Sequence, residues 1–300
     1  MPKESIRRRE RRKSGSRWFI ALLVVLAIAA GIVGVGCYLL LRYTRFPVTG
    51  SSFNILLIGE DKNYTRSGAA VSTAGRMDAI MLMVVPRDGT GATLVSIPRD
   101  TLVRFPSGGV HRINASIVTG GIELARSCVS DLVGLPVHRY MAIDFQSFIE
   151  VVDAMGGVEI AVDKRMNYED KAGGYDLDLK PGVYHMDGET ALKYVRFRHD
   201  ALGDISRAGR QQQFLKAILK ELATWDGVRS YRTILKVLQE YTRTDLTTEE
   251  MTAVGWRFRS LDSTAVDSAT LPGRFKGAYW EPDREGIEAM VNSIMSKSAK

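Results

Sequence analysis

The segment FNILLI at residues 53–58 decides the fold, because a near-continuous apolar run that ends at Gly59 is typical of a strand buried on both faces. Two similar runs follow, AIMLMVV at residues 79–85 and TLVSI at residues 93–97, and the turn sequence PRDG at residues 86–89 separates them. Three buried strands so close together in the chain predict the centre of a sheet that other elements cover on both sides.

Further helices and strands alternate irregularly after this centre. Helical spacing is found at residues 115–133, 145–155, 188–195, 207–222, 231–240 and 283–295. Thr247 and Glu250 form a capping box that opens one more helix, to about Arg259. Additional strands are expected at residues 138–143, 158–162 and 265–271. This pattern predicts an α/β fold, a layered α-β-α domain with a central mixed β-sheet, in which no repeat or Pro/Gly-rich linker marks a second domain.

The positive charge of the chain is concentrated at its N-terminus. The whole sequence carries a formal net charge of +7. Residues 1–17 contain eight Lys and Arg against two Glu, a net charge of +6, whereas residues 42–300 carry 33 basic and 32 acidic residues. A domain with almost no net charge lacks the basic surface that nucleic-acid binding requires, so we expect no nucleic-acid partner.

An uncharged run separates the basic tail from the domain. The 24 residues at 18–41 contain no charged side chain. As a helix they extend about 36 Å, enough to cross a bilayer core of about 30 Å with some tilt. The basic tail should remain in the cytoplasm, which places residues 42–300 outside. We therefore expect a cytoplasmic tail (1–17), one N-terminal transmembrane helix (18–41), a linker (42–52) and an extracytoplasmic domain (53–300) on the cytoplasmic membrane.

An uncleaved anchor has two alternatives. A cleavable signal peptide could end at the Ala27-Ile28-Ala29 sequence, but a dozen apolar residues follow it. A lipid-modified Cys37 is the second alternative, although Gly34-Val35-Gly36 matches a lipobox poorly. The only other cysteine is Cys128, so the domain can form no internal disulfide, and the four scattered histidines do not suggest a zinc site.

Arginine and aspartate dominate the candidate functional residues. Arg99 and Asp100 follow the third strand, at the kind of strand end where ligands bind in open α/β sheets. Asp61 follows the first strand. Arg76 and Asp78 precede the second strand and should lean to the same side of an extended backbone.

Two more groups of polar residues occur later in the chain. Arg196 and Arg198 share one face if their backbone is extended, and Arg207, Arg210 and Gln211 share a helix face through their i, i+3, i+4 spacing. Arginine binds phosphate through two hydrogen bonds and keeps its charge when desolvated, while carboxylates hold Mg²⁺. Together these residues describe a site for a pyrophosphate and Mg²⁺.

Each group also has an ordinary structural interpretation. An Arg pair at i, i+2 is often a solvated strand edge. The helical pair Arg207 and Arg210 could simply form ion pairs with Asp204 and Glu221 on a surface helix. Spacing alone does not choose between these interpretations and a phosphate site.

Eight short motifs, in this order, resemble those of the LytR-CpsA-Psr family of cell-envelope proteins. They are Gly59-Glu60-Asp61, Arg76-Met77-Asp78, Ser96-Ile97-Pro98-Arg99-Asp100, Ile113-Asn114-Ala115, Gly120-Gly121, Gly156-Gly157-Val158, Tyr194-Val195-Arg196-Phe197-Arg198 and Arg207…Arg210-Gln211-Gln212. The resemblance covers about residues 53–222. Each motif is weak alone, but eight in the same order are specific.

The resemblance implies a membrane-anchored phosphotransferase. Such proteins move teichoic-acid-like or capsular glycopolymers from a polyprenyl-pyrophosphate carrier to peptidoglycan. It places Asp61 and Asp78 where the family binds Mg²⁺. It places the pyrophosphate at Arg76, Arg99, Arg196, Arg198, Arg210 and Gln211, with Arg207 a further candidate. For catalysis we expect Arg99 to stabilise the developing charge and either Asp78 or Asp100 to act as the base for the acceptor hydroxyl, and the resemblance favours Asp78.

The sequence departs from the family pattern at three positions. Asn63 stands where a basic residue is common, Met77 replaces a small hydroxyl residue, and Arg112 replaces a lysine while keeping its charge. Two other functions use the same residues: hydrolysis of the lipid pyrophosphate, and non-catalytic binding of the lipid by a regulator of envelope assembly. The sequence does not locate the apolar slot that the carrier lipid needs.

Overall fold

The computed structural model describes residues 50–61, 76–87, 91–170, 175–197, 204–222, 225–259 and 265–297. The expected cytoplasmic tail, the transmembrane helix, most of the linker and the loop at residues 62–75 lie outside these ranges. All described residues belong to one compact unit, Phe46–Lys300. Among them, no helix combines the length and the apolar composition that crossing a membrane requires.

A six-stranded mixed sheet forms the centre, in the order β11-β6-β1-β2-β3-β12. Its strands are β1 (Ser52–Asp61), β2 (Arg76–Pro86), β3 (Ala92–Ser96), β6 (Arg139–Ile143), β11 (Arg243–Thr244) and β12 (Val266–Thr270). β2 is antiparallel to its neighbours β1 and β3, whereas β6 runs parallel to β1 and β12 runs parallel to β3. The predicted central mixed sheet is thus confirmed.

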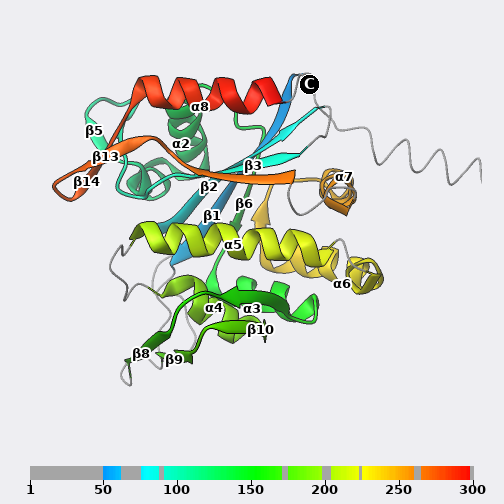
Figure 1. Ribbon diagram of the computed structural model, residues 1–300. Helices are drawn as coiled ribbons and strands as arrows, with labels where there is room; N and C mark the ends of the chain where they lie inside the picture. Colours follow the sequence, from blue (N-terminus) through cyan, green and yellow to red (C-terminus); the bar gives the residue numbers. More distant parts are fainter. Residues whose placement is uncertain are drawn as a thin grey trace, which may run out of the picture. The chain divides into compact units, whose positions relative to one another are not determined.

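Both faces of this sheet are covered by helices (Figure 1). Leu56 and Leu82 belong to the core that faces α2 (Ser116–Val133) and α8 (Arg284–Lys297). Ile55 and Met83 point the other way, toward α5 (Asp204–Leu222) and α7 (Thr248–Arg259). Because successive side chains of a strand alternate between its faces, a strand buried on both sides reads as an unbroken apolar run.

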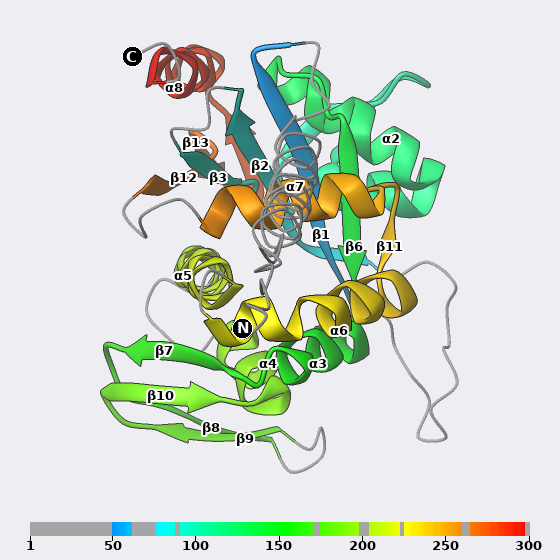
Figure 2. The same cartoon turned by 90° about the vertical axis from the view of Figure 1, so that its right-hand side faces the viewer.

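A second group of elements packs below α5 (Figure 2). It contains α3 (Phe145–Ala154), α4 (Gly188–Arg196) and α6 (Trp225–Tyr241). It also contains two antiparallel strand pairs. β7 (Val158–Val162) pairs with β10 (Gly182–Met186), and β8 (Met166–Asp170), which follows β7 in sequence, pairs with β9 (Tyr175–Leu179). These elements share their own apolar core, to which Ile160, Met186 and Phe214 belong.

Two short hairpins extend from the carboxyl ends of β3 and β12. They are β4 (Leu102–Arg104) with β5 (Val110–Arg112), which leads into a 3-10 helix at Ile113–Ala115, and β13 (Gly273–Lys276) with β14 (Tyr279–Pro282). Thr101 and Trp280 form a parallel bridge between them, so the hairpins lie side by side. The sequence did not predict these hairpins.

The predicted local signals are found where they were expected. Glu250 Oε2 accepts a hydrogen bond from the Thr247 N–H at 2.9 Å, and the Glu250 N–H donates to Thr247 Oγ1 at 3.2 Å, so the capping box is confirmed. The glycine break appears as a kink inside α2, where Gly121 has a φ of 68° that favours glycine. Cys128 is a buried free thiol.

Candidate functional site

The predicted polar residues lie at one end of the strands of the central sheet, which we call the sheet edge. The parallel pairs β1–β6 and β3–β12 end at this edge, and antiparallel β2 begins there. The edge therefore receives Asp61 from the end of β1, Asp78 from the start of β2, Arg99 from the turn after β3 and Asp144 from the turn after β6. This strand topology explains why residues far apart in sequence meet.

Asp78 and Arg99 form an ion pair at this edge. Arg99 Nη1 lies 2.7 Å from Asp78 Oδ1, and each side chain is about one-quarter exposed. Arg99 Nε lies 3.5 Å from Asp100 Oδ2, and Arg112 Nη1 lies 3.2 Å from Asp100 Oδ1. The four side chains thus alternate carboxylate and guanidinium along the edge.

The N-terminal part of α5 brings two buried arginines to the same region. Arg207 is 6% exposed and Arg210 is 7% exposed, so the alternative of a solvated surface helix is wrong for both. Arg207 Nη2 donates to the main-chain carbonyl of Asp78 at 3.3 Å. Arg210 Nη2 donates to the main-chain carbonyl of Phe197, and its guanidinium lies 5.3 Å from the centre of the Phe197 ring. Arg207 therefore reaches β2, whereas Arg210 holds the segment that follows α4.

The expectation of an extended Arg196–Arg198 pair is corrected by the structure. Arg196 is the last residue of α4, and Phe197 ends the helix with an extended ψ of 132°. The helix begins at an Asp187 cap whose Oδ1 accepts from the Thr190 N–H at 2.9 Å, and it keeps its amphipathic spacing through Arg196. The Arg196 guanidinium lies 4.3 Å from the centre of the Phe145 ring. Arg198 lies outside the described residues.

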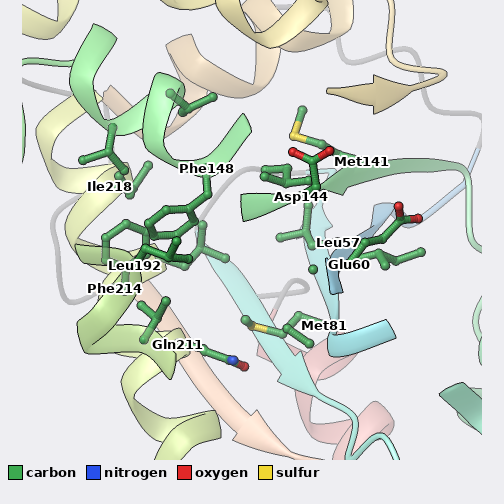
Figure 3. Close-up of a pocket in the computed structure, with 18 of the residues that line it drawn as sticks. Leu57, Glu60, Met81, Met141, Asp144, Phe148, Leu192, Gln211, Phe214 and Ile218 are labelled. Carbon is green, nitrogen blue, oxygen red and sulfur yellow. The ribbon is translucent and has the colours of Figure 1, made fainter. Parts of the chain in front are cut away.

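A cavity of about 620 Å³ opens beside this edge, between the sheet and the helices α3 to α7. Its wall is mainly apolar. Figure 3 shows Phe148, Leu192, Phe214 and Ile218 together on one side. The rings of Phe148 and Phe214 stack with their centres 4.8 Å apart. The sequence did not locate this cavity, because its wall is assembled from many elements.

The polar lining of the cavity comes from the sheet edge and from the two helices nearest to it. Its charged and amide-bearing residues are Glu60, Asp78, Asp144, Arg196, Arg207 and Gln211. Arg99, Asp100 and Arg112 do not line the cavity, so the Asp78–Arg99 pair stands at its border. The predicted residues Arg196, Arg207 and Gln211 are thereby brought together, whereas Arg210 is directed at Phe197.

Sequence reasoning missed two carboxylates of this lining. Glu60 is 2% exposed and pairs with Arg243 of β11. Asp144 caps α3, where its Oδ1 accepts from the Ser147 N–H at 2.9 Å. The position of Glu60 inside the Gly59-Glu60-Asp61 motif was the available signal, but its burial depends on the distant Arg243.

The predicted Mg²⁺ residues can be assessed from strand positions and donor chemistry. Asp61 pairs with Arg76 across β1 and β2, two positions from Asp78, and the structure describes only the backbone of Asp61 and Arg76. Within the described residues, no three His, Cys, Asp or Glu side chains are grouped to hold a metal ion. Two carboxylates completed by substrate phosphate oxygens are a donor set that Mg²⁺ commonly uses, so the residues fit a site of that kind.

Comparison with known proteins gives one consistent family. The model of the LytR_cpsA_psr family matches residues 44–296. The probable cell wall biosynthesis protein LcpB of Corynebacterium glutamicum is 38% identical over 176 residues, which are 59% of this chain and 41% of LcpB. The polyisoprenyl-teichoic acid–peptidoglycan teichoic acid transferase TagU of Enterococcus faecalis is 32% identical over 69% of this chain and 66% of TagU. The matches thus span less than two thirds of either relative.

The structural comparison agrees. The solved structure of TagT bound to LIIa-WTA superposes with a TM-score of 0.65 and 25% identity, covering 83% of this chain and 91% of that one. The similarity therefore extends over nearly the whole described domain.

Proposed function

The chain belongs to the LytR-CpsA-Psr family, and we propose that it transfers a phosphorylated glycopolymer from a polyprenyl-pyrophosphate carrier to peptidoglycan. One observation carries this proposal: an apolar cavity of about 620 Å³ meets a sheet edge that carries arginines and aspartates. The names of the relatives support it, since TagU is a teichoic acid transferase and TagT binds LIIa-WTA. The polymer could be a teichoic acid or a capsular glycan.

The donor fits the site in two parts. The polyprenyl chain would occupy the apolar part of the cavity, because removing its hydrocarbon from water is favourable. Its pyrophosphate would then lie at the border, where Arg196, Arg207 and Gln211 line the cavity. Arg99 borders the same place through Asp78, and Arg76, Arg198 and Arg210 remain proposed contributors on the family motif alone. Arginine suits this position because it stays charged when partly buried.

The transfer breaks the pyrophosphate bridge. The acceptor hydroxyl oxygen forms a bond to the phosphorus that carries the glycan, the bridging P–O bond breaks, and polyprenyl phosphate leaves. Asp78 is the proposed base for the hydroxyl proton, and Asp100 is the second candidate. Arg99, held between the two carboxylates, would stabilise the charge that develops on the phosphoryl oxygens.

A divalent cation fits this arrangement as a bound cofactor. Asp61 and Asp78 would hold Mg²⁺ together with the pyrophosphate oxygens, and the ion would supply charge neutralisation when bound. A carboxylate that binds a cation is a weaker base, which is the chemical reason for retaining Asp100 as the alternative.

An assay with the detergent-solubilised full chain tests the function. With a lipid-linked glycan donor, Mg²⁺ and soluble peptidoglycan fragments, we expect the glycan to become joined to the fragment through a phosphodiester. Polyprenyl phosphate should be released slowly without fragments and markedly faster with them. Release that ignores the fragments would favour the hydrolase, and no turnover of a verified donor would favour the binding-only regulator.

The membrane anchor is proposed from the sequence and from family membership. Residues 18–41 would hold the domain beside the lipid donor, with residues 42–300 outside the cytoplasmic membrane. Protease added to intact protoplasts should therefore degrade the domain. Protection of the domain until lysis would overturn this topology.

A further inference from the structure

The two hairpins beside the site share one outward face. In β4–β5, Arg104 pairs with Val110 and Leu102 pairs with Arg112, so these side chains share one face, whereas the buried Val103 points to the other. In β13–β14, Lys276 pairs directly with Tyr279, on the side opposite the buried Trp280. The parallel bridge between Thr101 and Trp280 joins the hairpins, and both bridge residues are buried. The residues next to them in sequence therefore point outward on the same side. We call this surface the hairpin face, and it is made of Arg104, Val110, Arg112, Arg274, Lys276, Tyr279 and Glu281.

The hairpin face combines an exposed ring with basic side chains. Tyr279 is 42% exposed and Val110 is 55% exposed. The guanidinium of Arg112 lies 4.8 Å from the centre of the Tyr279 ring. The face carries four basic side chains against the single carboxylate of Glu281, which pairs with Arg274 at 3.2 Å and with Lys276 at 3.0 Å. The hydrogen bond from Lys276, followed by that from Arg274, lowers the pKa of Glu281.

This face is continuous with the proposed reaction centre. Arg112 bridges Tyr279 and Asp100, because it lies over the Tyr279 ring and 3.2 Å from Asp100 Oδ1. The Trp280 N–H donates to the main-chain carbonyl of Asp100 at 3.0 Å, which fixes β14 to the same turn. Asp78 lines the cavity proposed for the donor, whereas Arg99, Asp100 and the hairpin face do not. The face thus adjoins the border of the site from outside the donor cavity.

We infer that the hairpin face binds the acceptor, a peptidoglycan glycan strand with its peptide stems, and presents its hydroxyl to the Asp78–Arg99 border. Sugar rings stack their C–H faces on exposed aromatic rings, and Tyr279 offers such a ring held in place by Arg112. The carboxylates of the peptide stems complement the basic side chains of the face. An in-line displacement also needs the acceptor and the leaving lipid phosphate on opposite sides of phosphorus, which separate donor and acceptor surfaces permit.

This inference rests on the proposed function for its choice of occupant, so binding is measured separately from transfer. The detergent-solubilised full chain is titrated with soluble peptidoglycan fragments in the absence of lipid donor, and Kd is read from calorimetry. We expect Tyr279→Ala and Lys276→Glu each to raise Kd about tenfold, which corresponds to about 1.4 kcal/mol. Tyr279→Trp, which keeps an aromatic surface, should bind within about twofold of wild type on the same energy scale.

Val183→Ala is the matched control, because Val183 is 67% exposed but lies on β10 in a different sheet. In the transfer assay, Tyr279→Ala should raise KM for the fragments about tenfold with little change in kcat, and Val183→Ala should change neither. Copurified lipid in each variant reports that the domain is folded.

The two assays separate the two proposals. If wild type carries out transfer and Tyr279→Ala has unchanged Kd and KM, the acceptor-binding role of the hairpin face is wrong and the proposed function stands. Fragment binding that depends on Tyr279, without transfer by wild type, would overturn the proposed function and leave the face as a wall-binding surface. Neither binding nor transfer by wild type would overturn both.

Discussion

The Nη1 atom of Arg99 lies 2.7 Å from Oδ1 of Asp78, and this contact joins the turn after β3 to the first residues of β2. It stands at the border of the apolar cavity, with Asp78 among the cavity-lining residues and Arg99 outside them. The pair therefore lies where the proposed lipid donor and the proposed acceptor would meet.

Substitutions at this contact should slow transfer without unfolding the domain. Asp78→Asn removes the proposed base and a proposed metal ligand, and should lower the transfer rate by about a hundredfold or more, the scale of a lost general base. Arg99→Lys keeps a charge but loses the planar fork, and should lower the rate about tenfold to a hundredfold, as expected for one or two charge-assisted hydrogen bonds. The measurement is phosphodiester formation on peptidoglycan fragments.

Arg165→Lys is the matched control for that experiment. Arg165, just before β8, pairs with Asp178 of β9 at 3.2 Å in an exposed position, and neither residue lines the cavity. Exposed pairs contribute at most about 1 kcal/mol, so this variant should keep both stability and transfer. Wild-type transfer by Arg99→Lys would remove Arg99 from the proposed mechanism.

Arg207 and Arg210 lie on the same helix face, but substituting them should affect different properties, lipid binding for Arg207 and stability for Arg210. Arg207 lines the cavity, so Arg207→Met should reduce copurified polyprenyl lipid about tenfold if it loses one contact to the pyrophosphate. Arg210 is directed at the Phe197 carbonyl, so Arg210→Met should mainly lower stability, by about 1.5–3 kcal/mol. Lipid content by mass spectrometry and thermal unfolding distinguish the two. Equal loss of lipid at unchanged stability would show that Arg210 also contacts the donor.

The central sheet could be predicted because the burial of its strands is recognisable from the local sequence alone. β1, β2 and β3 are covered on both faces, so each is an apolar run that needs no knowledge of its neighbours. The hairpins β4–β5 and β13–β14 have only one buried face and strands of three or four residues, which is too short for alternation to be recognised.

The candidate site was predicted only as a set of residue types. Strand ends and helix spacing indicated Asp78, Arg99 and Arg207, because those patterns are local. The burial of Glu60 against Arg243 could not be read from spacing, since 183 residues separate the two. The cavity was hidden for the same reason: Phe148 and Phe214 look like ordinary core residues until the space between α3 and α5 is known.

A side chain added at Gly255 should compete with the lipid. Gly255 lies on α7 and lines the cavity, and apart from the nearby backbone of its own helix and its two chain neighbours, no heavy atom lies within 4 Å of the position that a Cβ atom would take at this residue. Gly255→Leu should therefore lower the amount of copurified polyprenyl lipid several-fold. Gly255→Ala should keep the lipid and stabilise the domain by up to about 1 kcal/mol, because alanine favours the helix.

Gly209 provides the matched control for this substitution. It is also helical with open space around its Cβ position, but it does not line the cavity. Gly209→Leu should therefore leave the lipid content unchanged. Equal lipid content in Gly255→Leu and Gly209→Leu would mean that the chain does not extend to α7.

Acid should destabilise the domain through His138. Its Nδ1 accepts a hydrogen bond from the Asn54 N–H at 3.0 Å, at the start of the β1–β6 pairing, so the folded state needs the neutral ring. Burial, followed by the nearby charges of Arg139 and Arg126, lowers the pKa of His138 below its ordinary 6.5. The unfolded chain then takes up the proton first. This contribution to stability is complete above the unfolded pKa of about 6.5 and is lost as pH falls through the lower folded pKa.

We expect Tm to fall between about pH 7.5 and about pH 5.5 more steeply in wild type than in His138→Gln, which offers an amide oxygen to Asn54 and does not titrate. Both proteins should have the same pH dependence between about pH 7.5 and 8.5, where an imidazole of this kind stays neutral. Parallel Tm curves over the whole acid range would show that His138 does not couple protonation to folding.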